Sequence, residues 1–455
     1  MKTETAQDHF FIKNSCLCGI VAILALAGTA SGQSFSPSSP AREYVRLDDR
    51  IVAMESGRTS PSGGAVQVLL EMVDRGISSS STAQTSSLGT QLRLDPADYE
   101  SASASYSFET VATNTDSVSR QVELLDNLSV VMASVTVPSG TTDSTRFRSA
   151  TFTPNAGPTV YTIRVAQTTS SAQLKVYTGR IVVDQVGAIK TRIQIPLANY
   201  LNGASIGSQQ FVDSTSSTTY GQGNSNYFSI FYRDNDRYDG VAAWEFEVVS
   251  AGFGTTGTHK TSLFTRAGTQ LTTSEVTKVG GTIQLNVVDI TNDANFTNLT
   301  EFEVRHKVVS TNGFLYRAAL YVRLQNNFTK ADVYHRISRY HTATLPGYYT
   351  DSRVLYDASK VSNATTYFES VGWENTAGGQ KRKVVDMGTG DSGIPVDPPP
   401  TSVIGSDIDF PSSAKTRIRS GPFTLVSGKR YTLEVDSGGG ATAASTSFVV
   451  IAIVR

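Results

Sequence analysis

The sequence predicts an all-β fold of tandem antiparallel β-sandwich modules, either jelly-roll or immunoglobulin-like, after a signal peptide and a short N-terminal strand and linker. Three observations predict it. Almost every regular segment alternates apolar and polar side chains with a period of two, which places one set in a core and the other in water. Amphipathic helical periodicity is nearly absent. A short apolar pattern also recurs three times, which indicates three modules of similar construction.

The recurring pattern is Phe-Glu-x-Val, at Phe108–Val111, Phe246–Val249 and Phe368–Val371. Each copy is followed by a strand that begins with an aromatic residue, at Tyr161, Phe302 or Tyr431, and then by an apolar strand, at Gly179–Val183, Ala319–Arg323 or Phe448–Val454. A third marker equates Leu92–Tyr99 with Ile193–Tyr200 and with Val333–Tyr340. The spacing of about 120 to 140 residues suits sandwich domains better than a solenoid. We therefore expect modules at 65–185, 186–328 and 329–455.

The N-terminal residues 1–32 read as a secretory signal peptide. Lys13 precedes an apolar run over 17–27, and small residues lead to a cleavage site before Gln33. Both cysteines, Cys16 and Cys18, lie inside this segment. The mature chain would then have no disulfide and no thiol ligand for a metal. We expect a secreted protein, extracellular or at the cell surface.

Residues 33–64 are rich in Ser, Pro and Gly and predict a flexible leader that carries one strand at 43–55. This strand resembles the closing strand of Rhs/YD-repeat proteins, although no other repeat of that type follows. A strand on a flexible leader can add to an open sheet edge of a neighbouring subunit, as in donor-strand complementation. The alternative is that it pairs with its own first module.

The low charge of the chain argues against nucleic acids and anionic membranes as partners. Charged residues make up 17% of the chain and the net charge is −1, against a usual charged share of about 25%. Nucleic acids and anionic membranes require a concentrated positive surface, so we expect neither as a partner. No stretch after residue 32 is long enough to span a bilayer.

Two serine motifs match catalytic patterns in sequence but lack the structural context that catalysis requires. Gly203–Gly207 reads Gly-x-Ser-x-Gly, but no helix is predicted after Ser205. Gly390–Pro395 resembles the nucleophile segment of trypsin-like proteases, which also needs a positioned His and Asp. The histidines His259, His306, His335 and His341 offer neither that setting nor metal-ligand spacing. We therefore predict no catalytic residue and no enzyme.

The segment 234–240 places oxygen ligands at alternate positions before a glycine. Asp234, Asp236 and Asp239 could thus bind a structural Ca²⁺. The alternative is an ordinary Asp/Asn/Gly turn. No other cofactor is expected.

Exposed aromatic side chains can stack on sugar rings, and Trp373, Tyr348 and Tyr349 are the candidates for glycan contact. The alternative is that they pack in the sheet cores. The predicted function is that of a structural or adhesive subunit of an extracellular fibre, filament or surface layer. It would associate with itself or with other extracellular proteins, in part through strand 43–55. An array of carbohydrate-binding modules is the alternative, and a glycan-active enzyme is the third hypothesis.

Overall fold

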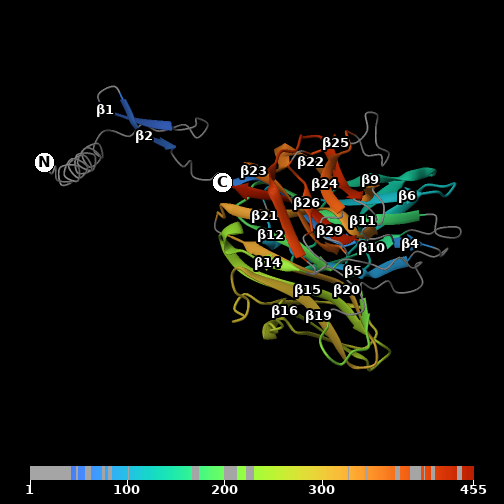
Figure 1. The fold of residues 1–455 in the computed structure, drawn as a ribbon. Helices are drawn as coiled ribbons and strands as arrows, with labels where there is room; N and C mark the ends of the chain where they lie inside the picture. The colour runs from blue at the N-terminus through green and yellow to red at the C-terminus, as the bar shows by residue number, and fades with distance from the viewer. Residues whose placement is uncertain are drawn as a thin grey trace. The chain divides into compact units, whose positions relative to one another are not determined.

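The computed structural model describes residues 42–47, 50–56, 63–73, 77–79, 85–100, 102–165, 174–198, 213–221, 230–325, 327–343, 347–374, 380–389, 401–403, 405–410, 416–437 and 443–455. In these ranges the chain forms β-strands and four short 3-10 helices (Figure 1). Within the same ranges, no helix has the length and apolar character needed to cross a membrane. The predicted signal peptide and the two serine motifs lie outside the described residues.

The chain divides into two compact units, residues 1–60 and 61–455. The described part of the first unit is an antiparallel hairpin of β1 (Arg42–Leu47) and β2 (Arg50–Ser56). Sequence analysis expected a single strand over 43–55. The structure differs because the chain reverses between Leu47 and Arg50, which pair with each other.

The described part of the second unit contains six sheets that form three sandwiches of two sheets each. In each sandwich we call the sheet that holds its first strand the large sheet and the other one the small sheet, whatever their numbers of strands. In the first sandwich the large sheet has the order β3-β11-β6-β9, with β4 beside β11, and the small sheet has the order β5-β10-β7-β8. The elements are β3 (Gly63–Val73), β4 (Ile77–Ser79), β5 (Thr85–Leu94), η1 (Pro96–Asp98), β6 (Ser105–Asn114), β7 (Arg120–Leu125), β8 (Val131–Val137), β9 (Thr141–Phe152), β10 (Thr159–Val165) and β11 (Leu174–Gly187).

In the second sandwich the large sheet has the order β12-β20-β15-β18, with β13 beside β20, and the small sheet has the order β14-β19-β16-β17. The elements are β12 (Thr191–Ala198), β13 (Asp213–Thr215), β14 (Phe231–Arg233), η2 (Asn235–Arg237), β15 (Val241–Gly252), β16 (Thr258–Thr265), η3 (Thr272–Ser274), β17 (Val276–Val279), β18 (Gln284–Asp289), β19 (Thr300–Ser310) and β20 (Gly313–Leu324).

In the third sandwich the large sheet has the order β21-β29-β23-β27, and the small sheet has the order β22-β28-β24-β25, with β26 beside β24. The elements are β21 (Lys330–Ala343), β22 (Gly347–Tyr356), η4 (Ala358–Lys360), β23 (Ala364–Glu374), β24 (Gln380–Asp386), β25 (Thr401–Ser402), β26 (Ile408–Asp409), β27 (Thr416–Phe423), β28 (Lys429–Ser437) and β29 (Ala443–Val454).

The three sandwiches share one topology. If the eight principal strands of each are counted in chain order, the large sheet runs 1-8-3-6 and the small sheet 2-7-4-5. This is the arrangement of a jelly roll, in which two four-stranded sheets are connected by Greek keys. The predicted fold class of tandem antiparallel sandwiches is therefore confirmed, and the topology selects the jelly-roll alternative. The exact module boundaries stay a prediction.

Two of the three sequence markers fall at equivalent places. The Phe-Glu-x-Val copies lie in β6, β15 and β23, the third strand of each large sheet. The two strands that follow each copy are central in the small and large sheets. The third marker was wrong: Leu92 lies in β5 of a small sheet, whereas Ile193 and Val333 lie in the first strands of large sheets, β12 and β21.

Alternation along the strands builds the core. Phe108, Phe246 and Phe368 are fully buried between the sheets of their own sandwiches, and burial of such a side chain contributes about 1.5–3 kcal/mol. The buried apolar residues of all three sandwiches join in one cluster. The sandwiches therefore pack on one another as well as within themselves.

Candidate functional site

The Glu of each Phe-Glu-x-Val copy is the starting point of the candidate site. Because side chains alternate along a strand, Glu109, Glu247 and Glu369 point to the face of the large sheet opposite the phenylalanines. All three are nevertheless almost completely buried. A carboxylate removed from water in this way requires a cation and hydrogen bonds.

Each of these carboxylates holds an arginine of its own large sheet. The guanidinium Nε of Arg180 on β11 donates to Glu109 at 2.8 Å. Arg317 on β20 donates through Nη2 to Glu247, and Arg417 on β27 donates through Nε to Glu369. Charge-assisted bonds of this kind are stronger than bonds between neutral groups.

Each arginine also reaches a backbone carbonyl of another sandwich. Arg317 Nε donates to Gln91 O of the first sandwich at 3.0 Å. Arg417 Nη1 donates to Ile230 O of the second sandwich at 2.7 Å, and Arg180 Nη2 to Arg353 O of the third at 3.0 Å.

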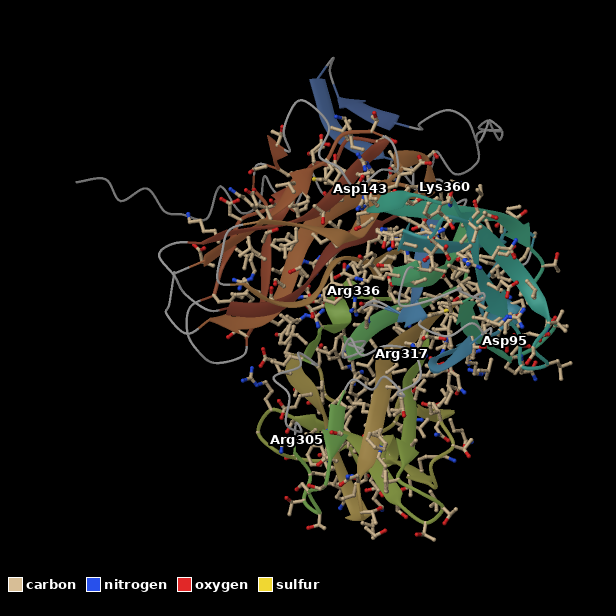
Figure 2. The ribbon with its side chains drawn as sticks, turned by 90° about the vertical axis from the view of Figure 1, so that its right-hand side faces the viewer. Asp95, Asp143, Arg305, Arg317, Arg336 and Lys360 are labelled. Atoms are coloured by element: carbon tan, nitrogen blue, oxygen red, sulfur yellow. The ribbon has the colours of Figure 1, made fainter. Side chains whose placement is uncertain are left out.

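The three carbonyls occupy the same position, because the residues that follow Gln91, Ile230 and Arg353 pair with Tyr161, Phe302 and Tyr431 of the central small-sheet strands. The contact of Glu, Arg and carbonyl, which we call the junction contact, thus joins the sandwiches in the cyclic order first, second, third and first again. In Figure 2, Arg317 and Arg336 lie where the sandwiches meet, whereas Arg305 lies further out in the second sandwich.

Electrostatics at the junction differ from one carboxylate to the next. Burial alone raises the pKa of Glu109, but Arg180 and Arg146 outweigh burial and lower it to about 2. Burial raises the pKa of Glu71, against the opposing charges of Arg180 and Arg336. The ion pairs therefore offset the cost of removing these charges from water to different degrees.

The 3-10 helices repeat the same cyclic order. Asp95, Asp234 and Asp357 cap η1, η2 and η4 by accepting a backbone N–H two residues later. The last residue of each helix contacts the next large sheet through Asp98–Arg323 at 2.8 Å, Arg237–Glu369 at 3.3 Å and Lys360–Asp184 at 3.4 Å. The capped helices η1, η2 and η4 therefore also contribute ion pairs between neighbouring sandwiches.

This repeat explains where the predicted calcium ligands lie. Asp234 accepts Asp236 N at 3.0 Å and pairs with Arg237 Nε at 3.2 Å. Asp239 accepts the backbone N–H groups of Thr329 and Lys330 at 2.6 and 2.8 Å. Asp236 is exposed. Within the described ranges no group of three or more acidic, His or Cys residues is placed to bind a metal, and the calcium site stays a prediction.

The three candidate glycan-contact residues lie in two different sheets. Trp373 is in β23 and pairs with Ala444, whereas Tyr348 and Tyr349 are in β22 and pair with Glu434 and Leu433. Their side chains lie outside what the structure describes. The prediction of glycan contact at these residues stays untested.

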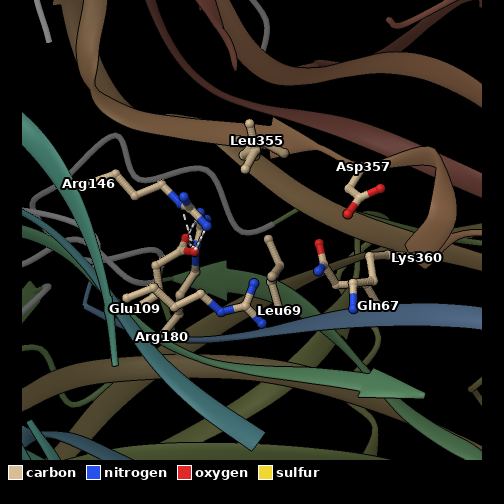
Figure 3. A pocket seen from close by; sticks show the side chains of 10 residues that line it. Gln67, Leu69, Glu109, Arg146, Arg180, Leu355, Asp357 and Lys360 are labelled. Carbon is tan, nitrogen blue, oxygen red and sulfur yellow. Dashed lines mark hydrogen bonds and ion pairs between the residues drawn. The ribbon is translucent and has the colours of Figure 1, made fainter. Parts of the chain in front are cut away.

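A small cavity lies at the junction of the first and third sandwiches (Figure 3). Its volume is about 40 Å³, and Glu109, Arg146 and Arg180 face Leu355, Asp357 and Lys360 across it. Ligand pockets usually measure about 300–1,000 Å³, so this cavity holds water at most. Its lining includes Glu109 and Arg180 of the junction contact.

Three histidines have described side chains in the jelly-roll unit, His259, His306 and His335, and all three are buried. His259 Nε2 and His306 Nδ1 lie 2.9 Å apart and both rings are buried. His335 Nε2 lies 3.3 Å from Gln67 O. The His259–His306 pair was not foreseen, because nothing in the sequence indicates that His259 and His306 lie on neighbouring strands.

Sequence analysis also missed the junction arginines. A readable signal existed, because Thr145-Arg-Phe-Arg-Ser149 in β9 repeats as Thr416-Arg-Ile-Arg-Ser420 in β27. In both strands the first arginine bonds the motif glutamate, Arg146 to Glu109 and Arg417 to Glu369. Strand β27, which carries Arg417, thus supplies the arginine of the junction contact in the third sandwich.

Comparisons with known proteins add no argument about this chain. No known protein family and no curated protein matches the chain. Similar solved structures include one of Sulfolobus Turreted Icosahedral Virus, with 15% identity, 80% of this chain and 83% of that chain covered, and a TM-score of 0.18. A second, of the triple jelly roll fold and turret assembly in an archaeal virus, has 15% identity, 88% and 98% coverage and a TM-score of 0.17. The VP2 subviral particle of infectious bursal disease virus has 9% identity, 84% and 75% coverage and a TM-score of 0.20. At these TM-scores the similarities support no argument about function.

Proposed function

We propose that the chain is a non-catalytic structural protein whose three jelly rolls act as one rigid building block of an extracellular fibre, filament or surface layer. The observation that carries this proposal is the cyclic repetition of the junction contact. Buried charged hydrogen bonds between sandwiches restrict their relative motion, because breaking one leaves a charge without its partner. Mechanical rigidity of this kind suits an assembly subunit.

Assembly by strand pairing is the finer part of the proposal. The hairpin of β1 and β2 precedes the jelly-roll unit in a separate compact unit. In the described part of the chain, each strand of this hairpin pairs only with the other, so each leaves one edge for a further strand. An added strand from a neighbouring subunit would be held mainly by main-chain hydrogen bonds.

Electron microscopy and light scattering of the secreted chain test this proposal. We expect polymers for the natural chain and monomers after deletion of residues 33–60. Val45→Pro removes a backbone donor inside β1 and should also reduce polymerisation, whereas Ser34→Pro, outside both strands, should not. A natural chain that stays monomeric, or polymers that survive the deletion, would refute assembly through the hairpin.

A further inference from the structure

A second, larger pocket lies between the first and second sandwiches. Its volume is about 380 Å³, within the usual range of about 300–1,000 Å³ for small-molecule sites. The first sandwich contributes β5, β10 and the β7–β8 turn, and the second contributes the start of β18. The lining residues are Gln91, Asp126, Asn127, Ser129, Val160, Thr162, Ile283, Gln284 and Leu285.

One wall of the pocket is open because of a small residue on β10. Val160 precedes the strand residue Tyr161, and the third sandwich has Arg430 at that place, before Tyr431. Arg430 is buried, and its guanidinium donates to Met387 O at 3.0 Å and to Thr389 O at 3.2 Å. The side chain that fills this space in the third sandwich is therefore absent from the first.

The opposite wall shows the same substitution pattern. The Val of each Phe-Glu-x-Val copy pairs with a residue on the edge strand of its large sheet. That residue is Arg146 in the first sandwich, Arg417 in the third and Leu285 in the second. Since Leu285 lacks the long cationic side chain, the junction of the first and second sandwiches keeps a cavity where an arginine could lie.

The lining combines polar side chains with an aliphatic floor, and Asp126 is its one charged residue. Val160, Ile283 and Leu285 supply the apolar surface. Amide and hydroxyl groups come from the other lining residues, Gln91, Asn127, Ser129, Thr162 and Gln284.

The one charged group of the lining is already committed to its own turn. Asp126 accepts the N–H groups of Leu128 and Val130 at 2.9 and 2.8 Å, and the Asn155 side chain at 3.0 Å. No Lys or Arg lines the pocket. The carboxylate of Asp126 is therefore the one charge in this lining, and no cationic side chain lines the pocket to bind an anionic ligand.

We propose that this pocket binds a neutral carbohydrate of one or a few sugar units. Hydroxyl-rich neutral ligands match a lining of amides and hydroxyls, and their C–H faces match the aliphatic floor. This site would add glycan binding to the structural role, and it is separate from the aromatic residues that the sequence suggested.

The test is a glycan array printed with neutral glucan, mannan, galactan and chitin fragments, and with sulfated and sialylated glycans as the charged contrast. We expect the full secreted chain to bind at least one neutral fragment. Val160→Arg, which copies the filled third sandwich, should weaken that binding by about tenfold or more, equivalent to about 1.4 kcal/mol. Val309→Arg, at an exposed position on β19 outside the pocket, is the matched control and should bind as the natural chain does.

Thr162→Val keeps the size of the side chain, removes one hydroxyl, and should weaken binding without filling the pocket. Thermal unfolding of each variant shows whether it is folded, and Thr162→Val remains informative if Val160→Arg is not. Binding only to charged glycans, no binding to any neutral fragment, or equal binding by the natural chain and the folded pocket variants would each overturn the proposal. None of these outcomes depends on whether the chain polymerises.

Discussion

At the scale of single residues, the motif glutamates connect local sequence to the packing of whole sandwiches. In each copy the phenylalanine fills the core of its own sandwich, while the glutamate orients an arginine toward a neighbour. Arginine suits this task because its planar guanidinium can bond a carboxylate and a carbonyl at the same time. A lysine would present a single point charge in place of this fork.

Removal of one motif carboxylate should be costly. Glu369 is 1% exposed and faces Arg417 and Arg237. Glu369→Ala removes the carboxylate that pairs with the buried guanidinium of Arg417, so we expect a loss of about 3–5 kcal/mol in the free energy of unfolding. Glu434→Ala in the same sandwich is the control, because its ion pair with Lys383 at 3.5 Å is partly exposed and contributes about 0–1 kcal/mol. Urea unfolding measures both, and equal losses would contradict a special role for the junction.

The buried side chain of His259 predicts a pH dependence of stability. Burial, with a smaller contribution from His306, lowers the pKa of His259 well below its ordinary value. The unfolded chain then binds a proton at higher pH than the folded chain, so the stabilisation is present above about pH 6.5 and is lost as the pH falls below it.

We expect the urea midpoint to decrease when the pH is lowered from 7.5 to 5. His259→Phe, if it folds, should reduce the pH dependence of the unfolding free energy by the equivalent of about one bound proton. His335, whose pKa burial lowers to about 4, contributes in the same direction and should remain in the variant. A pH dependence of the unfolding free energy that is unchanged by His259→Phe would contradict the role given to His259.

The acidic segment 234–240 fits two descriptions that its spacing alone does not separate, and the calcium site stays a prediction. Oxygen ligands at alternate positions are typical of a calcium loop, yet the same sequence pattern also occurs in a 3-10 helix with an N-cap aspartate. Asp95 and Asp357 cap the equivalent helices η1 and η4 in the other sandwiches. The pattern could have been recognised as a cap had Asp95, Asp234 and Asp357 been aligned.

At the scale of elements, the edge strands β9 and β27 share a register shift against their neighbouring strands. Both ladders shift register beside the motif, between Ser107 and Glu109 and between Tyr367 and Glu369. The backbone N–H released by each shift is captured by a serine, Phe108 N by Ser149 Oγ at 2.9 Å and Phe368 N by Ser420 Oγ at 3.0 Å. Bulges of this kind redirect side chains at sheet edges.

Ser420→Ala should therefore destabilise the third sandwich. Loss of the hydroxyl leaves the Phe368 N–H without its acceptor, which costs about 1–3 kcal/mol where water cannot replace it. Ser119→Ala is the control, since its hydroxyl accepts Ser139 N at 3.4 Å on the exposed surface and should matter by less than about 0.5 kcal/mol. Chemical denaturation of the two variants tests this, and a smaller loss for Ser420→Ala than for Ser119→Ala would contradict the role given to the bulge.

The strands that sequence analysis placed correctly are those in which alternation is strict. β28 carries Tyr431, Leu433 and Val435 on one face, and all three are buried, which a period-two pattern reports directly. Leu92–Tyr99 was matched to the wrong strands because its Leu-x-Leu start also occurs where a large sheet begins. The Thr-Arg-x-Arg-Ser strands were overlooked because their burial depends on a neighbouring sandwich, which no local pattern records.

At the scale of the whole molecule, the packing of the sandwiches could not be predicted from sequence. Each junction contact ends on a backbone carbonyl, and the identity of the accepting residue, Gln91, Ile230 or Arg353, carries no signal. The partners are also far apart in the chain, so their encounter follows from tertiary packing alone. Tandem modules were predictable, but the cyclic arrangement in which the third contacts the first was not.

The central claim is that the three jelly rolls form one cooperative unit closed by the junction contacts. Differential scanning calorimetry of residues 61–455 tests it most directly. The account predicts one transition whose calorimetric enthalpy equals its van't Hoff enthalpy, and a lower transition temperature in Glu369→Ala. Two or three separable transitions, with Glu369→Ala shifting only one of them, would show that the sandwiches unfold independently and would contradict the claim.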